Sequence, residues 1–238
     1  RKGARGWLNA LPFILPGLIL VMAFVVYPLI FTVRIALSEY QIVQGKITFL
    51  GLENFRKVLS GDSRFWYAYR NNFLYAFVTV PFILLGGMLF SYLINNLRRG
   101  QGIFRVGFYL PVITSWVIVS LVFQYMFNNS NRGLINYILV DVLHLMDDYV
   151  PWLLREWSGN AAIWLMGIWK NMGWAMLIYL AALQGIPKER YEAAELDGAG
   201  IWAKFWHITV PSLRPTTFYV MVNMIIGSFN VFIQVMML

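Results

Sequence analysis

The sequence predicts an all-α membrane protein built as a polytopic bundle of transmembrane helices. Of the 238 residues, 59% are hydrophobic and only 13% are charged, whereas soluble domains carry about 25% charged residues. One soluble core of this size cannot hide so much apolar surface, so lipid is the natural alternative solvent. Long apolar stretches, separated by short connections, support the same fold class.

Five stretches reach the roughly 20 apolar residues that a membrane-spanning helix needs. They are residues 11–35, 72–96, 104–127, 161–183 and 216–238. The longest connection between them, residues 36–71, is shorter than an ordinary soluble domain. We therefore expect a single transmembrane domain over 1–238. Because the chain begins without methionine and stops inside an apolar run, we also expect it to be part of a longer protein.

Two connections carry short apolar patterns with helical spacing. The first follows Gly51 and the second follows Gly133. Their apolar members are Leu52, Phe55, Val58 and Leu59 in the first, and Leu134, Ile135, Ile138, Leu139, Val142 and Leu143 in the second. This spacing predicts amphipathic helices that lie on the membrane or on the surface of a partner.

The distribution of lysine and arginine favours a cytoplasmic N-terminus, because loops on the cytoplasmic side carry an excess of these residues. The segments then placed inside hold Arg1, Lys2, Arg5, Arg98, Arg99, Arg105, Lys188, Arg190, Lys204 and Arg214. The connection 128–160 holds two basic residues, Arg132 and Arg155, against four acidic ones. The connection 36–71 does not fit this orientation, because it would lie outside and yet carries Lys46, Arg56, Lys57, Arg64 and Arg70.

Composition also argues against several classes of function. The net charge of +8 comes from basic residues beside apolar runs, which suit membrane anchors better than a nucleic-acid surface. The chain has no cysteine, which excludes thiol catalysis and cysteine-based metal sites. The sequence has no G-x-x-x-x-G-K-[ST] phosphate loop, so we do not expect the chain to hydrolyse ATP itself. No nucleophile–base pair points to an enzyme.

Ionisable residues inside a bilayer are costly and are usually functional. All eleven acidic residues lie outside the five stretches, which disfavours a transporter coupled to protons or sodium ions. Lys170 is the one charge well inside a stretch, roughly 13 Å below Ala161 at 1.5 Å per residue. It either contacts a polar pathway or extends its side chain to the outer interface.

Polar residues form a stripe on the last apolar stretch. Asn223, Gly227, Asn230 and Gln234 share one face of a continuous helix with Thr216. Amides facing lipid would lack hydrogen-bond partners, so the stripe should face protein or a water-filled path. It serves either for helix packing, with Gly227 allowing close approach, or as part of a pathway. A shorter stripe on the fourth stretch contains Gly167, Asn171 and Trp174.

Residues 184–215 predict a short helix–turn–helix between the last two stretches. Pro187 suits the first turn of a helix, and Lys188 to Leu196 are good helix formers. Gly198 and Gly200 interrupt the helix, and a second helix from Ile201 should stop near Pro211. Such an element suits docking of a helix into a groove on another protein, or serves as a connector on the bilayer.

The residues of this loop resemble a known motif. The order Glu192-Ala193-Ala194, Asp197-Gly198-Ala199, Phe205, Ile208 and Pro211 is similar to the EAA loop of permease subunits in ABC importers. Residues 105–111 and 133–136 fit the same family. The likeness is to the carbohydrate and glycerol-phosphate branch, and in it to the large maltose permease subunit.

The resemblance implies a fold and a set of partners. It implies a type I permease with six spans, of which five are visible, in the cytoplasmic membrane of a bacterium or archaeon. The EAA loop, residues 187–211, would be a coupling helix that docks on an ATPase. The implied partners are a second permease subunit in a heterodimer, two cytoplasmic ATPase subunits, an extracytoplasmic solute-binding protein and membrane lipid, with no nucleic acid. The chain itself would bind no cofactor, and ATP with Mg²⁺ would bind to the ATPases.

Roles for individual loop residues follow from the same resemblance. Glu192 would meet a basic group of the ATPase, while Ala193 and Ala194 allow close approach. Gly198 would make the turn and Asp197 would brace it. Ala199 and Phe205 complete the coupling set.

The expected solute is a sugar or a sugar-like molecule. The candidate pathway residues are Lys170, Asn171, Trp174, Asn223, Gly227, Asn230 and Gln234. Amides both donate and accept hydrogen bonds, which suits sugar hydroxyls, and Trp174 could stack on a sugar ring. The alternatives are a permease of the same family for another solute, such as an amino acid or a polyamine, and a membrane scaffold subunit with no transport role.

Overall fold

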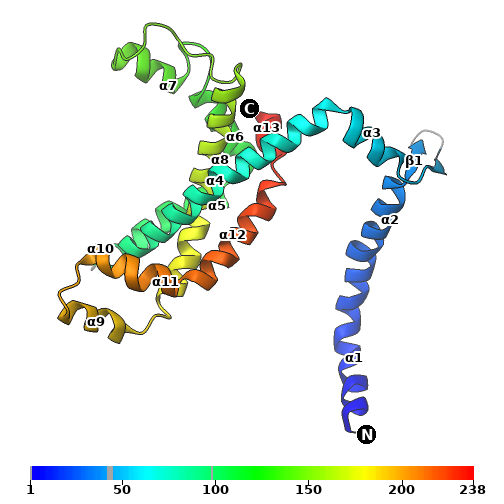
Figure 1. Ribbon diagram of the computed structural model, residues 1–238, viewed down its shortest axis with the longest axis horizontal. Coiled ribbons are helices and arrows are strands. Elements are labelled where there is room, and N and C mark those ends of the chain that lie inside the picture. Colours follow the sequence, from blue (N-terminus) through cyan, green and yellow to red (C-terminus); the bar gives the residue numbers. More distant parts are fainter. Residues whose placement is uncertain (1, 42–44, 98) are drawn as a thin grey trace. The chain divides into compact units, whose positions relative to one another are not determined.

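The computed structural model describes residues 2–41, 45–97 and 99–238, with side chains from Leu11 onward. Arg1 and Arg98, two of the expected cytoplasmic anchors, lie outside the described residues. The fold is mostly helical (Figure 1). The chain divides into two compact units, Arg1–Tyr69 and Arg70–Leu238, and each is described by itself. The long helix α4 (Ser63–Asn95) begins in the first unit and continues through the second.

The first unit contains one long apolar helical segment, followed by a small β-hairpin and a short helix. Its elements are α1 (Lys2–Val21), the π-helical turn η1 (Met22–Val26), α2 (Tyr27–Ala36), strands β1 (Ser38–Gln41) and β2 (Lys46–Phe49), and α3 (Glu53–Gly61). The two strands form an antiparallel hairpin in which Ser38 pairs with Phe49. α3 confirms the first of the two amphipathic helices expected in the connections.

The second unit is a helical bundle with two long connections. After α4 come α5 (Gln101–Ile113), α6 (Trp116–Met126), α7 (Leu134–Asn136), η2 (Tyr137–Val142), α8 (Glu156–Leu183), α9 (Lys188–Leu196), α10 (Ile201–Lys204), η3 (Phe205–Thr209), α11 (Val210–Ser212), α12 (Arg214–Ser228) and α13 (Ile233–Met237). α7 and η2 together form the second expected amphipathic helix. α4, α5, α8 and α12 run along the body of this unit (Figure 1).

The five expected spans are only partly confirmed. Among the described residues, two helical segments are long and apolar enough to cross a membrane, Leu11–Ala36 and Ser63–Asn95. The pair α5 and α6 adds a third if it crosses as one broken span. α8 covers the expected stretch 161–183, but it carries Lys170 and Asn171 in its middle, which lower its hydropathy. The last stretch holds no sufficiently long helix.

The expected continuous helix over 104–127 is wrong, because the chain bends by 96° between α5 and α6. Thr114 and Ser115 adopt extended backbone angles, with ψ of 138° and 141°. Ser115 caps the next helix, since its hydroxyl accepts a hydrogen bond from the Val117 N–H at 3.3 Å. Ser115, whose side chain competes for backbone hydrogen bonds, thus starts a new helix at a point where hydropathy alone predicts that the first helix continues.

The bend leaves carbonyl groups at the end of α5 without donors from the next helical turn. The ammonium group of Lys170 on α8 donates hydrogen bonds to them instead. It donates to the carbonyls of Pro111, Val112 and Thr114 at 2.8, 3.1 and 2.5 Å. The Leu110 carbonyl accepts from the Thr114 hydroxyl at 2.8 Å. Only 5% of Lys170 is exposed, so its side chain does not extend to the outer interface. Lys170 caps a broken helix.

The expected continuous helix over 216–238 is also wrong. α12 ends at Ser228, four irregular residues follow, and α13 begins at Ile233. Ser228 and Asn230 bond their side chains to carbonyls of the last helical turn, at 2.6 Å to Ile225 and 3.3 Å to Ile226. Short polar side chains that hydrogen-bond locally offer the backbone an alternative to the helix, which explains the break.

The core of the second unit lies where α4, α8 and α12 meet. Its buried side chains include Ile83, Tyr92, Tyr179, Phe205 and Val220. α4 and α8 approach closely through small residues, because a Cβ on Gly87 would lie 2.8 Å from the Cβ of Ala175. The core holds together the helices that carry the polar residues described below.

Replacing Lys170 with methionine should destabilise the protein. The change removes the shared donor of three carbonyls beside a side chain that is only 5% exposed, at a cost of about 1–3 kcal/mol for each unsatisfied group. We expect the midpoint of thermal unfolding to fall by several degrees, with Lys170→Arg recovering most of the loss. The exposed Lys188→Met is the matched control. Equal midpoints for Lys170→Met and Lys188→Met would contradict the capping role.

Candidate functional site

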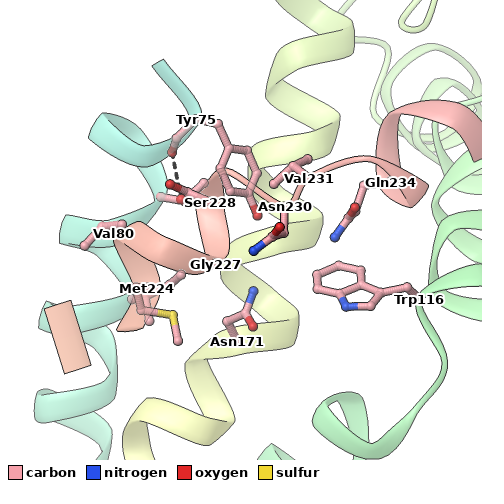
Figure 2. Close-up of a pocket in the computed structure, with 12 residues that line it drawn as sticks. Tyr75, Val80, Trp116, Asn171, Met224, Gly227, Ser228, Asn230, Val231 and Gln234 are labelled. Atoms are coloured by element: carbon pink, nitrogen blue, oxygen red, sulfur yellow. Dashed lines mark hydrogen bonds between the residues drawn. The ribbon is translucent and has the colours of Figure 1, made fainter. Parts of the chain in front are cut away.

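A cavity of about 260 Å³ lies beside the two helix breaks of the second unit. Its wall combines residues from α4, α6, α8, α12, α13 and the segment between the last two. Polar and aromatic members are Tyr75, Thr79, Trp116, Asn171, Ser228, Asn230 and Gln234. Figure 2 shows the side chains of Asn171, Asn230 and Gln234 turned toward one space beside the Trp116 ring. The breaks therefore bring three amides from different helices together.

The three amides keep hydrogen-bonding capacity in reserve. Asn171 and Asn230 each donate one N–H to the carbonyl four residues earlier, at 2.9 and 3.3 Å. Gln234 is only 6% exposed, yet within the described part of the chain its Oε1 atom receives no hydrogen bond. A buried acceptor without a donor is costly, so this oxygen suits a ligand that donates an O–H or N–H.

Trp116 connects the cavity with the Lys170 cap. Its ring lines the cavity, and the Lys170 ammonium lies 4.8 Å from the ring centroid in a cation–π arrangement. Lys170 itself does not line this cavity. It borders a separate hollow with Thr114 and Ser115, and all three of its N–H groups already have acceptors.

The structure brings together four of the seven expected pathway residues on the cavity wall. These are Asn171, Gly227, Asn230 and Gln234. Asn223 lies elsewhere, with its side chain exposed and donating to the Tyr219 carbonyl at 2.9 Å. Trp174 packs against the core, 6.4 Å from the Tyr219 ring. The predicted polar stripe required one straight helix. The break after Ser228 turns only Asn230 and Gln234, which follow it, toward the cavity.

Four polar or aromatic lining residues were missed from the sequence: Tyr75, Thr79, Trp116 and Ser228. Tyr75 and Thr79 lie one helical turn apart on α4, and the Thr79 hydroxyl donates to the Tyr75 carbonyl at 2.7 Å. Such a pair within an apolar helix is a signal for an inward face. Trp116 could not be placed without the bend that precedes it.

The expected helix–turn–helix over 187–211 is confirmed. α9 ends at Leu196, and Gly198 turns the chain with a positive φ of 78°, a conformation that suits glycine. The N–H of Ala199 reaches the Ala194 carbonyl at 2.8 Å and that of Gly198 the Glu195 carbonyl at 3.0 Å, which closes the end of α9.

Side chains join the two arms of this loop. Lys204 pairs with Glu195 at 2.5 Å, and the Tyr191 and Thr209 hydroxyl groups lie 2.9 Å apart. Arg190 donates to the Ser212 hydroxyl at 3.4 Å. With contacts on both arms, the loop forms one structural element, not a loose connector.

The loop is anchored to the body of the second unit through Phe205 and Tyr92. Phe205 is 5% exposed and its ring lies 5.0 Å from that of Tyr92 on α4. The Tyr92 hydroxyl donates to the Ile201 carbonyl at 2.9 Å. Phe205, expected as a coupling residue, is thus almost fully buried within the chain and anchors the loop.

The other expected coupling residues lie on the outer side of the loop. Glu192, Ala193, Asp197 and Gly198 are exposed, while Ala194 and Ala199 are half-buried. Leu196 follows Glu192 by one helical turn and is 90% exposed. In the described part of the chain, the carboxylates of Glu192 and Asp197 have no hydrogen-bond partner. The sequence-based role of Asp197 in bracing the turn thus has no contact to support it here.

At the other end of this unit, the connection 128–160 is ordered around one buried amide. Asn136 donates to the carbonyls of Asn128, Ser130 and Val150 at 3.0–3.3 Å. Its Oδ1 accepts from the Val150 N–H and from the Trp152 indole at 3.1 and 2.8 Å. Both the nitrogen and the oxygen of the Asn136 amide are hydrogen-bonded, and their partners lie at both ends of the connection. These bonds hold the connection 128–160 in one conformation.

Known proteins match the chain over most of its length. Residues 58–238 match the family of binding-protein-dependent transport system inner membrane components. The arabinooligosaccharides transport system permease protein AraP of Halalkalibacterium halodurans is 35% identical over 214 residues, which are 89% of this chain and 66% of that protein. The lactose transport system permease protein LacF of Rhizobium radiobacter is 31% identical, covering 97% of this chain and 74% of that protein.

A solved structure resembles the fold as well. A chain in the crystal structure of a bacterial ABC transporter involved in the import of the acidic polysaccharide alginate superposes with a TM-score of 0.79 and 25% identity. The match covers 96% of this chain and 75% of that one. By its family match and by its relatives, this chain belongs to the binding-protein-dependent transport system inner membrane components, the permease subunits of ABC importers.

Proposed function

We propose that this chain forms part of the translocation path of an ABC importer for a sugar or a sugar-like solute. The observation that carries the proposal is the cavity between the two helix breaks. It gathers three amides, three hydroxyl-bearing residues and two aromatic rings, with Tyr75 supplying both a hydroxyl and a ring. Groups that both donate and accept hydrogen bonds, combined with flat apolar faces, are suited to the alternating hydroxyls and C–H surfaces of sugars.

The cavity favours an uncharged, hydroxyl-rich solute over the alternatives. Of the described residues that line it, none carries a formal charge. A polyamine would call for a carboxylate partner, and an amino acid would call for partners of both signs. The volume of about 260 Å³ is slightly below the roughly 300–1,000 Å³ of complete ligand pockets. A second permease subunit would supply the opposing wall of a heterodimeric path.

Coupling to ATP is assigned to the loop 187–211. Its Glu192 and Leu196 are exposed one turn apart, and its arms are joined by the Glu195–Lys204 pair. A rigid, exposed helix with a carboxylate suits docking in a groove that carries a basic group. The partners proposed for this face are two cytoplasmic ATPase subunits, which hold ATP and Mg²⁺.

The topology proposed places the N-terminus and the loop 187–211 in the cytoplasm, with five crossings of the membrane. α8 and the pair α12–α13 then cross although they are less apolar than a lone span, because the cavity accommodates their polar residues. The ordered connection 128–160 faces outward and receives the solute-binding protein. The excess of basic residues on the inner segments supports this orientation.

Glu192→Ala should uncouple ATP hydrolysis from uptake while leaving insertion unchanged. Losing one partner of an interfacial charge pair costs about 2–5 kcal/mol, which is tenfold or more in uptake rate. Glu189→Ala, one turn earlier on the same helix, is the control. Uptake and ATPase assembly are measured in parallel in membranes. Wild-type values of both for Glu192→Ala would refute the assignment.

The proposed topology can be tested by labelling, since the chain has no cysteine. A cysteine at Val140 should react with a membrane-impermeant maleimide in intact cells, and one at Arg190 only after permeabilisation. Reaction at 190 in intact cells would reverse the orientation and would remove the coupling role of the loop.

Gln234→Leu and Asn230→Leu should weaken transport selectively. Each change removes hydrogen bonds to the solute worth about 1 kcal/mol, or about fivefold in uptake efficiency per bond. Basal ATP hydrolysis and assembly should persist. Asn223→Leu is the matched control, because this amide lies off the cavity wall. If all three variants lose assembly alike, the amides serve helix packing and the solute lies elsewhere.

A further inference from the structure

The short helix α3 of the first unit presents an apolar face that its own unit does not cover. Leu52, Phe55 and Leu59 recur at a spacing that aligns them along one side of the helix. Their exposed fractions are 71%, 47% and 55%. Single exposed apolar residues are ordinary, whereas two such residues on a nine-residue helix, aligned with a third at its N-cap, Leu52, indicate a surface that contacts something apolar.

The opposite side of α3 is fixed to the end of the first apolar helix. Asn54 donates its side-chain N–H groups to the carbonyl of Ala36, the last residue of α2, at 3.1 Å and to that of Ser38 at 2.9 Å. The segment ending at Ala36 is one of the two helical segments, among the residues that the structure describes, that are long and apolar enough to span a membrane alone. These two bonds therefore hold α3 at the level where that span leaves the lipid.

Aromatic residues hold the other end of α3. The Trp66 indole, in the first turn of α4, donates to the Leu59 carbonyl at 3.0 Å. Around it, Phe65 and Tyr69 form ring contacts with centroid separations of 5.5–5.9 Å. Tryptophan and tyrosine are enriched where membrane helices pass through the lipid headgroups. Both ends of α3 are thus tied to elements suited to this depth.

Charged residues are placed to suit the same environment. Arg56 follows Phe55 and lies at the edge of the apolar face, while Lys57 lies on the opposite side of the helix, since two residues correspond to more than half a turn. A long basic side chain at such an edge can keep its stem along lipid and its charge beside phosphate.

We propose that α3 lies in the membrane interface, with Leu52, Phe55 and Leu59 inserted among phospholipid chains and Arg56 against lipid phosphates. The alternative is a protein docked on this face. A stable protein interface uses about 20–30 residues on each side, whereas this face offers three apolar side chains at the level of the bilayer surface. The proposal needs only the segment Leu11–Ala36 to be a span, and it does not depend on the solute or on coupling.

The test uses the assembled importer reconstituted in phospholipid bilayers. Single cysteines replace Phe55, Leu59 and Lys57 in this cysteine-free chain, and each carries a nitroxide spin label. Power-saturation measurements compare collisions with oxygen, which concentrates in lipid, and with a neutral nickel chelate, which stays in water. We expect oxygen to dominate at 55 and 59 and the nickel chelate to dominate at 57, where the same helix faces water.

Two results would overturn the proposal. One is nickel access at 55 and 59 as high as at 57, which would place the apolar face in water. The other is nickel access at 55 and 59 that falls only when the solute-binding protein is added, which would make this face a protein-docking surface. Uptake measured with each labelled complex verifies that the importer is assembled, so a lost signal from misfolding is not counted as support.

Discussion

The polar architecture of the second unit depends on one interaction, the three hydrogen bonds from the Lys170 ammonium to carbonyls around the bend between α5 and α6. A helix broken inside a membrane exposes carbonyl groups that lipid cannot satisfy. Lys170 supplies every donor it has to that end, and its positive charge also suits the negative end of the α5 dipole. Without this cap, the 96° bend would leave uncompensated polar groups.

The bend in turn determines where the cavity lies. It redirects the chain so that Trp116, the first residue of α6, lines the space opposite Asn171. The second break, after Ser228, does the same for Asn230 and Gln234. Irregular backbone at membrane depth is tolerated where protein or a polar cavity surrounds it. The two breaks and the amide cluster therefore depend on each other. The polar cavity surrounds the irregular backbone of both breaks, and both breaks are needed to bring the cavity-lining side chains together.

Sequence patterns predicted the elements better than their continuity. The loop turn at Gly198 followed from glycine and helix-former positions, since local chemistry decides a turn. Hydropathy predicted 104–127 and 216–238 as unbroken, because it averages over residues and does not register a capping serine or a lone Asn230 that bonds its own backbone. For the same reason Asn223 and Trp174 were misplaced, and Tyr75 was missed. Lys170 was found as an anomaly, but its acceptors depend on a bend that no local pattern shows.

The helix α4 joins the two sites that the proposal assigns to energy and to solute. At one end Tyr92 holds the loop through the Ile201 carbonyl and the Phe205 ring. Seventeen residues earlier, about 26 Å along a helix at 1.5 Å per residue, Tyr75 lines the cavity. Between them α4 packs on α8 through Gly87 and Ala175 without intervening side chains. Closely packed interfaces shift as units, so under the proposed function a displacement of the loop would act on the cavity wall through a helix that both sites share.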